Sequence, residues 1–233
     1  MPANSDMPKA IVLISVLLCY CIAGFGQFKK IHAVKVIAAP RIDGSLEDEV
    51  WRSAPLVTGF VTSTPVFGQS SSDRTEVKVL YDNNAVYIGA YLYCDPNLLK
   101  RQFTPRDQER QADADHFGIF IDSYFDKQNA YQFLVTSRNV QTDARLSSNI
   151  IPAEGIYGDL SWDGVWDSQV SMHTDGWSIE IKIPLFSIRF SGKRNDQWGI
   201  QFMRYNRSRN EIAFWNPVDP NTSGFVNQFG VLD

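Results

Sequence analysis

The chain has 233 residues, with 22 Lys and Arg against 26 Asp and Glu, which gives a formal net charge of −4. A chain of this balance lacks the basic field that nucleic acid requires, so we exclude nucleic acid as a partner. Of the three cysteines only Cys94 lies beyond the first 26 residues, so residues 27–233 have no internal disulfide and depend on core burial. Their length suits one β-domain.

Residues 1–26 have the pattern of a signal peptide. Lys9 precedes the apolar run "AIVLISVLLCYCIAGF", which ends in small residues before a polar stretch. The run is shorter than the about 20 residues of a transmembrane helix. We therefore expect cleavage before Gln27 and export to the periplasm, the cell surface or the outer membrane. A lipid anchor on Cys19 or Cys21 is the alternative interpretation.

The first predicted element is a short helix in "SLEDEVWRSA", residues 45–54. Ser45 is a candidate N-cap with Asp48 three residues later, and Val50 and Trp51 would then share one apolar side. No later segment shows a sustained helical period. This helix is therefore the one expected near the N-terminus.

The remaining pattern is that of β-strands. Apolar and polar residues alternate through Trp177–Ile183, as they do in a strand with one buried face. The same alternation occurs in residues 116–122, 130–136 and 198–202, and Asp82-Asn83-Asn84 has the composition of a hairpin turn. Many short strands with polar turns predict an all-β fold, a two-sheet antiparallel sandwich of immunoglobulin-like or jelly-roll-like form, in one domain over residues 27–233.

Five stretches together resemble the family 9 carbohydrate-binding modules. They are "RIDGSLEDEVWRSAP", "VKVLYDNNAVYIGAYLYCDP", "ADADHFGIFIDSYFDKQNAYQFLV", "GWSIEIKIPLFSIRF" and "WGIQFMRYNRSRNEIAFW". The chain is most similar to the divergent type at the N-terminus of long exported bacterial proteins with a predicted outer-membrane β-barrel. The resemblance implies a DOMON-like sandwich, a sugar held between tryptophan faces and structural calcium; haem is the other ligand of such folds.

Tryptophans are the first candidates for sugar contact, because an aromatic face packs against the C–H groups of a sugar ring. Trp162 lies in the turn-like stretch "DLSWDGVWD" and is the candidate platform, whereas Trp166 more simply fixes the root of that loop. Trp215, beside the loop "NPVDPNTSG", is a second candidate. By their alternation, we expect core positions for Trp51, Trp177 and Trp198.

Three polar residues could line the same site. Arg106 and Arg204 offer the rigid guanidinium fork that suits hydroxyl and carboxylate oxygens, and either could equally form an ordinary salt bridge. Asn216, next to Trp215, is a further possible contact.

Acidic residues gather in "RDQERQADADHFGIFIDSYFD", residues 106–126. Asp113, Asp115, Asp122 and Asp126 could supply oxygen ligands to calcium, although no spacing matches an EF-hand loop. A carboxylate pair across a cleft would permit glycoside hydrolysis, and solvated loop ends are the plainer explanation.

No nucleophile, zinc or phosphate-loop motif is present in the sequence, and the three histidines lack a metal-ligand spacing. We therefore expect a non-catalytic carbohydrate-binding module that holds a polysaccharide or oligosaccharide near a glycoside hydrolase or an outer-membrane barrel. The alternatives are a structural domain that packs on such a barrel without a sugar site, and a glycoside hydrolase.

Overall fold

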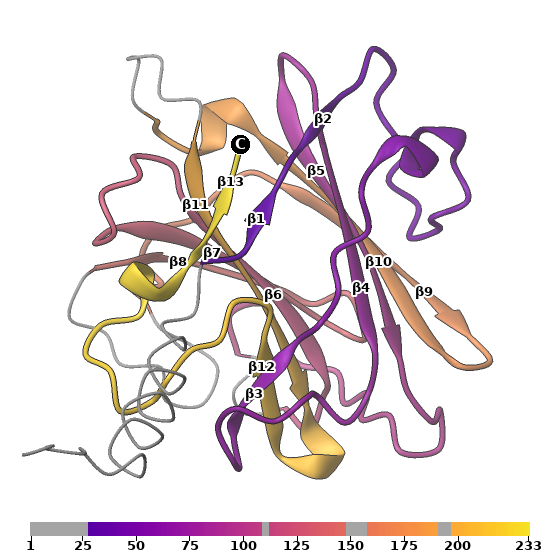
Figure 1. The fold of residues 1–233 in the computed structure, drawn as a ribbon. Helices are drawn as coiled ribbons and strands as arrows, with labels where there is room; N and C mark the ends of the chain where they lie inside the picture. Colours follow the sequence, from indigo (N-terminus) through magenta and orange to yellow (C-terminus); the bar gives the residue numbers. More distant parts are fainter. Residues whose placement is uncertain (1–27, 109–111, 148–157, 191–196) are drawn as a thin grey trace, which may run out of the picture.

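The computed structural model describes residues 28–108, 112–147, 158–190 and 197–233 (Figure 1). The predicted signal peptide, residues 1–26, lies outside them. None of the helices in the described ranges has the length and apolar character needed to cross a membrane.

Two sheets face each other (Figure 1). The five-stranded sheet has the order β2 (Val34–Lys35), β4 (Thr75–Tyr81), β5 (Ala85–Tyr93), β10 (Gly176–Pro184) and β9 (Asp167–His173). The eight-stranded sheet runs β1 (Lys30–Ile31), β13 (Gly230–Leu232), β11 (Trp198–Asn206), β6 (His116–Asp122), β7 (Ala130–Thr136) and β8 (Gln141–Leu146), and β12 (Glu211–Phe214) joins β11 to β3 (Val61–Thr64). The predicted all-β sandwich is confirmed, with one difference: β1–β13 and β2–β4 pair in parallel, so both sheets are mixed.

The apolar side chains of the alternating strands form the core between the two sheets. Ile179, Ile181 and Ile183 of β10 point inward and pack in one cluster with residues such as Ile119 and Phe133 of the opposite sheet. Each of these five side chains is fully buried. Because burial of each such side chain stabilises the fold by about 1.5–3 kcal/mol, this layer is the main source of stability.

Further apolar clusters cover part of each outer face. Phe225 and Phe229, in the segment after β12, pack on Phe120 of the eight-stranded sheet. On the five-stranded sheet, Trp51 packs in one cluster with Leu80 and Tyr87. The central strands are therefore buried on both faces, which is why several of them are apolar at nearly every position.

The predicted N-terminal helix is present but shorter than expected. It is a 3₁₀ helix, η2 (Glu49–Ser53), that begins after Asp48, and no side chain caps it. Ser45 instead lies in the preceding turn, where its N–H donates to the Asp43 carboxylate. The other 3₁₀ helices are η4 (Leu185–Ser187), η5 (Arg207–Arg209) and η6 (Val226–Gln228).

One buried carboxylate fixes this N-terminal segment on the sheet. Glu180 of β10 is fully buried, and its carboxylate accepts hydrogen bonds from Trp51 Nε1 at 2.7 Å and from the backbone N–H groups of Asp43 at 2.8 Å and Gly44 at 2.9 Å. Burial raises the pKa of Glu180 although these three donors oppose the shift. At Gly44, φ is +88°, and a Cβ atom would lie 2.7 Å from the backbone of Val170. The stretch "IDG", with Trp51, is therefore a docking element for the segment.

Replacement of Glu180 should destabilise the protein strongly. Glu180→Ala leaves three N–H donors, two of them buried, without an acceptor, so we expect the free energy of unfolding to fall by about 3 kcal/mol or more. Glu180→Gln keeps one acceptor oxygen and should lose clearly less. Urea unfolding of both variants measures the effect, and a loss below about 1 kcal/mol for Glu180→Ala would contradict this role.

His116, the first residue of β6, is a buried histidine. Its side chain is 3% exposed, it contacts the Tyr205 ring at 4.9 Å, and neither ring nitrogen has a hydrogen-bond partner among the described residues. Burial, which the nearby backbone of Ala114 offsets only in part, lowers the pKa of His116 to about 4. The preceding residue shows the opposite shift, because burial raises the pKa of Asp115 to about 6.

These shifts predict opposite effects of pH on stability. For His116, whose pKa is lower in the folded chain, stability is present above the unfolded pKa of about 6.5 and is lost as the pH falls toward 4. For Asp115, whose pKa is raised, stability increases over the same descent. We expect the advantage of wild type over His116→Phe in free energy of unfolding to shrink by about 3 kcal/mol at most between pH 7 and pH 4. Denaturant unfolding at several pH values tests this, and a constant difference would refute it.

Candidate functional site

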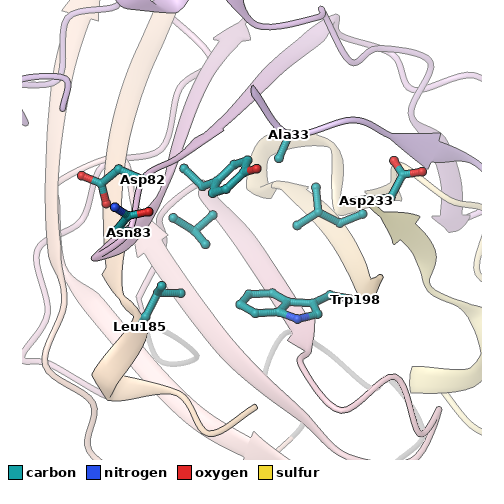
Figure 2. A pocket seen from close by; sticks show the side chains of 9 residues that line it. Ala33, Asp82, Asn83, Leu185, Trp198 and Asp233 are labelled. Atoms are coloured by element: carbon teal, nitrogen blue, oxygen red, sulfur yellow. The ribbon is translucent and has the colours of Figure 1, made fainter. Parts of the chain in front are cut away.

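A hollow of about 550 Å³ opens at one end of the sandwich, between the two sheets. We call it the sandwich mouth; it is lined by Ala33, Tyr81, Asp82, Asn83, Val86, Leu185, Trp198, Leu232 and Asp233. Figure 2 shows Asp82, Asn83 and Leu185 on one side of it and Trp198 and Asp233 on the other. The five-stranded sheet supplies the first side through its β4–β5 turn, and the eight-stranded sheet supplies the second through β11 and β13.

Aromatic surface at the mouth comes from strand ends. Trp198 is the first residue of β11; it packs in part on the core, is half-buried and contacts the Phe190 ring at 5.9 Å. Tyr81, the last residue of β4, is 37% exposed. A ring at the end of a strand lies at the rim, because the rest of the strand packs against only one side of the ring. Such a rim can offer an aromatic face to a ligand.

Polar groups surround this aromatic surface. Asp82 Oδ1 accepts from the N–H groups of Asn84 at 2.7 Å and Ala85 at 2.8 Å, and Oδ2 accepts from the Tyr87 hydroxyl at 3.0 Å. Partial desolvation acts to raise the pKa of Asp82, but these three hydrogen bonds and the positive charge of Lys182 outweigh it and hold the pKa below its ordinary value. Asp82 is therefore an ionised acceptor fixed by its own turn.

The other polar groups of the rim are less constrained. Asn83 is exposed, and its side chain makes no hydrogen bond within the described part of the chain. On the opposite side, Asp233 pairs with His32 at 2.7 Å. An amide and two carboxylates thus flank rings and aliphatic side chains, the combination that binds a molecule with both C–H faces and hydroxyl groups.

Three of the residues predicted for the sugar site come together, but elsewhere. Trp162 is half-buried, with its ring 4.9 Å from Tyr131 and 5.8 Å from Phe133. Trp166 is buried against the same Phe133. Arg106 lies beside this loop. The loop therefore packs along the β8 edge of the sandwich, away from the mouth.

Arg106 is engaged by neighbours of that loop. Its guanidinium pairs with Asp143 at 2.5 Å and Asp163 at 3.0 Å, and it donates to Gln141 at 2.9 Å. Asp143 also accepts from the Gly164 N–H at 2.5 Å. This ion-pair cluster holds the loop against β8.

Trp215 and Asn216 are buried, which corrects their predicted placement at an exposed rim. The Trp215 ring is 3% exposed because it packs on Phe202 and over Gly230, where a Cβ atom would lie 2.4 Å from the indole. Asn216 accepts from the Lys29 N–H and donates to the Gln228 carbonyl. Both residues hold the segment after β12 in place.

Arg204 is likewise inside the sandwich and does not line the rim with Trp162. It is 2% exposed and donates to the backbone carbonyls of Arg74 and Tyr93 and to the Thr75 hydroxyl. Since Arg204 lies on β11 and its acceptors flank β4 and β5, the guanidinium links the two sheets.

The four aspartates proposed as calcium ligands do not meet at one point. Asp113 and Asp115 precede β6 whereas Asp122 ends it, and seven extended residues span about 23 Å. Asp122 accepts from the N–H groups of Asp126 and Lys127, and Asp115 accepts from the Arg207 N–H. No group of three or more His, Cys, Asp or Glu side chains suited to a metal ion occurs within the described ranges.

Trp198 and the turn Asp82–Asn83 are the mouth residues that sequence reasoning assigned to other roles. The alternation of apolar and polar residues predicted that Trp198 lies in the core, and Asp82–Asn83 were predicted only as the turn of a hairpin. The sequence feature that could have indicated this site is position, because an aromatic residue at the first or last position of a strand lies at an end of the sandwich.

Solved structures of other proteins share this architecture. No curated protein sequence matches the chain at a significant level. A family 9 carbohydrate-binding module from Caldicellulosiruptor kristjanssonii has a similar structure in complex with cellotriose (20% identity, 88% of this chain and 93% of that chain, TM-score 0.60) and with glucose (19%, 88% and 95%, 0.62). A candidate carbohydrate-binding protein from Bacteroides uniformis is similar at 10% identity over 88% of this chain and 99% of that chain, with a TM-score of 0.65.

These likenesses establish the sandwich fold, which is the one predicted. The sequence model of one family, described as carbohydrate family 9 binding domain-like, matches residues 42–233, from the segment that Glu180 holds to the last strand. The chain belongs to the carbohydrate family 9 binding domain-like family.

Proposed function

We propose that this protein is a non-catalytic module that binds an oligosaccharide or the exposed part of a polysaccharide in the sandwich mouth. The observation that carries the proposal is the half-buried ring of Trp198 facing the Asp82–Asn83 turn across a hollow of about 550 Å³. The ring and the aliphatic lining suit the C–H face of a sugar, and Asn83 and the two carboxylates suit its hydroxyls. Family membership supports the same function.

The first ligands to test are β-glucan oligosaccharides, because cellotriose and glucose occupy the similar Caldicellulosiruptor module. A non-catalytic role is supported by family membership, because the matching family is one of carbohydrate-binding domains. As part of the proposal, the exported module keeps a polysaccharide close to a glycoside hydrolase or an outer-membrane barrel during carbohydrate breakdown.

One observation favours a second function, a structural domain that packs on such a barrel. Phe186 is 79% exposed and Phe190 is 45% exposed, and both follow β10 near the mouth. Exposed aromatic side chains of this kind also occur at protein interfaces. Sugar titration separates the two functions, because a purely structural domain binds no sugar at any length.

Trp198→Ala should weaken sugar binding at least about tenfold, because it removes the aromatic face of the mouth. Isothermal titration calorimetry with cello-oligosaccharides measures the change, and a thermal melt verifies folding. Trp162→Ala is the matched control: it removes a half-buried tryptophan from the β8 edge and should leave affinity unchanged. The reverse result, loss with Trp162→Ala alone, would place the site at the "DLSWDGVWD" loop.

The two residues of the turn should separate binding from stability. Asn83→Ala removes an amide without internal partners, so we expect roughly three- to tenfold weaker binding and an unchanged melting temperature. Asp82→Ala leaves two N–H groups and a hydroxyl without their acceptor and should lower the free energy of unfolding by about 1–2 kcal/mol. Calorimetry and urea unfolding of both variants test this, and an affinity unaffected by Asn83→Ala would remove that amide from the site.

A further inference from the structure

Two more hollows adjoin the sandwich mouth. A middle hollow of about 340 Å³ shares Asn83 and Leu185 with the mouth and adds Lys182 and Phe186. An outer hollow of about 510 Å³ begins at the same Lys182. The three hollows therefore follow one another, from the open end of the sandwich to the outer face of the five-stranded sheet.

Lys182 is the residue common to the middle and outer hollows. Its neighbours Ile181 and Ile183 point into the core, so its side chain lies on the outer face of β10. In register, it is flanked by Asp167 of β9 and Tyr87 of β5. Within the described ranges its ammonium group makes no hydrogen bond or ion pair shorter than 4 Å, although its charge acts on Asp82 and helps to lower the pKa of that carboxyl, so its N–H donors can reach a ligand in either hollow.

Each hollow combines hydroxyl-binding groups with apolar surface. The middle hollow has Lys182 and the amides of Asn83 and Asn84 beside the ring of Phe186, which is 79% exposed. That combination repeats the chemistry of the mouth, where Asn83 and two carboxylates surround Trp198.

The outer hollow is more polar. Asp167 and Gln169 are exposed on β9, the predicted sugar contact Trp166 also lines this hollow, and Pro40 and Ile42 form an apolar wall. That wall belongs to the segment that Glu180 holds through Asp43 and Gly44, so it is a fixed boundary of the hollow. A ligand that leaves the middle hollow past Lys182 thus meets hydroxyl-binding side chains beside a rigid apolar wall.

We propose that the three hollows form one binding track for an extended carbohydrate chain of several sugar units, which enters at Trp198 and passes Phe186 and Lys182 to the outer face of the five-stranded sheet. This inference rests on the proposed function of the mouth. Its consequence is that affinity rises with the number of sugar units, because each added unit reaches a further hollow.

Titration calorimetry with sugars of increasing length, from glucose to the hexasaccharide in the cello-, xylo- and laminari-series, tests the track. In the wild-type protein we expect the hexasaccharide of the preferred series to bind at least about tenfold more tightly than the disaccharide. Lys182→Ala and Phe186→Ala should each reduce this gain and leave the affinity for the shortest ligand that binds unchanged. Trp198→Ala should weaken binding at every length.

Matched controls are present on the same molecule. Lys35→Ala removes another lysine of the five-stranded sheet, and Phe103→Ala removes a phenylalanine that is 71% exposed; neither residue lines a hollow. Both should retain the full gain with length. An affinity independent of length, or an equal loss at every length in Lys182→Ala, would overturn the track while the mouth remained a sugar site. Absence of binding to every sugar would overturn the proposed function as well.

Discussion

The architecture depends on one buried carboxylate, because Glu180 fixes an irregular N-terminal segment on the five-stranded sheet, and this segment covers part of the sheet's outer face. Without an acceptor at this point, the backbone N–H of Gly44 and the indole of Trp51 would be buried unsatisfied, and the Asp43 N–H would lose its partner. The same segment supplies the wall of the outer hollow. "IDG" and the tryptophan after it, which belong to the first stretch of the family resemblance, therefore encode the attachment of this layer to the sheet.

The regular part of the fold could be predicted from sequence because alternation is a local property. Trp177–Ile183 formed the expected strand, and Asp82-Asn83-Asn84 formed the expected turn. Non-local pairing could not be predicted: nothing near Lys30 indicates that it pairs in parallel with Val231. The predicted N-terminal helix is present, but the predicted cap is not: the helix begins after Asp48, and the Ser45 N–H donates to the Asp43 carboxylate in the preceding turn.

The candidate site was less predictable for a related reason. A tryptophan in a polar turn suggests exposure, yet Trp162 rests on Tyr131 and Phe133, which approach it from a strand far away in the sequence. Trp198 has the opposite character, since its alternation indicates the core and only its position at the start of β11 leaves one face open. Which rings can meet a ligand is decided by where the two sheets end, and one local stretch of sequence does not contain that information.

The parallel pairing of β1 with β13 has a mechanical consequence. Backbone hydrogen bonds join Val231 to Lys29, Asp233 to Ile31, and Ala33 to Asp233. In a parallel pair, the start of one strand and the end of the other lie at opposite ends of the ladder. Tension applied between residue 28 and residue 233 would load these bonds together, in shear, so that they share the force and do not open one by one. The pairing of the two ends of the fold would therefore oppose unfolding by a force applied in this direction.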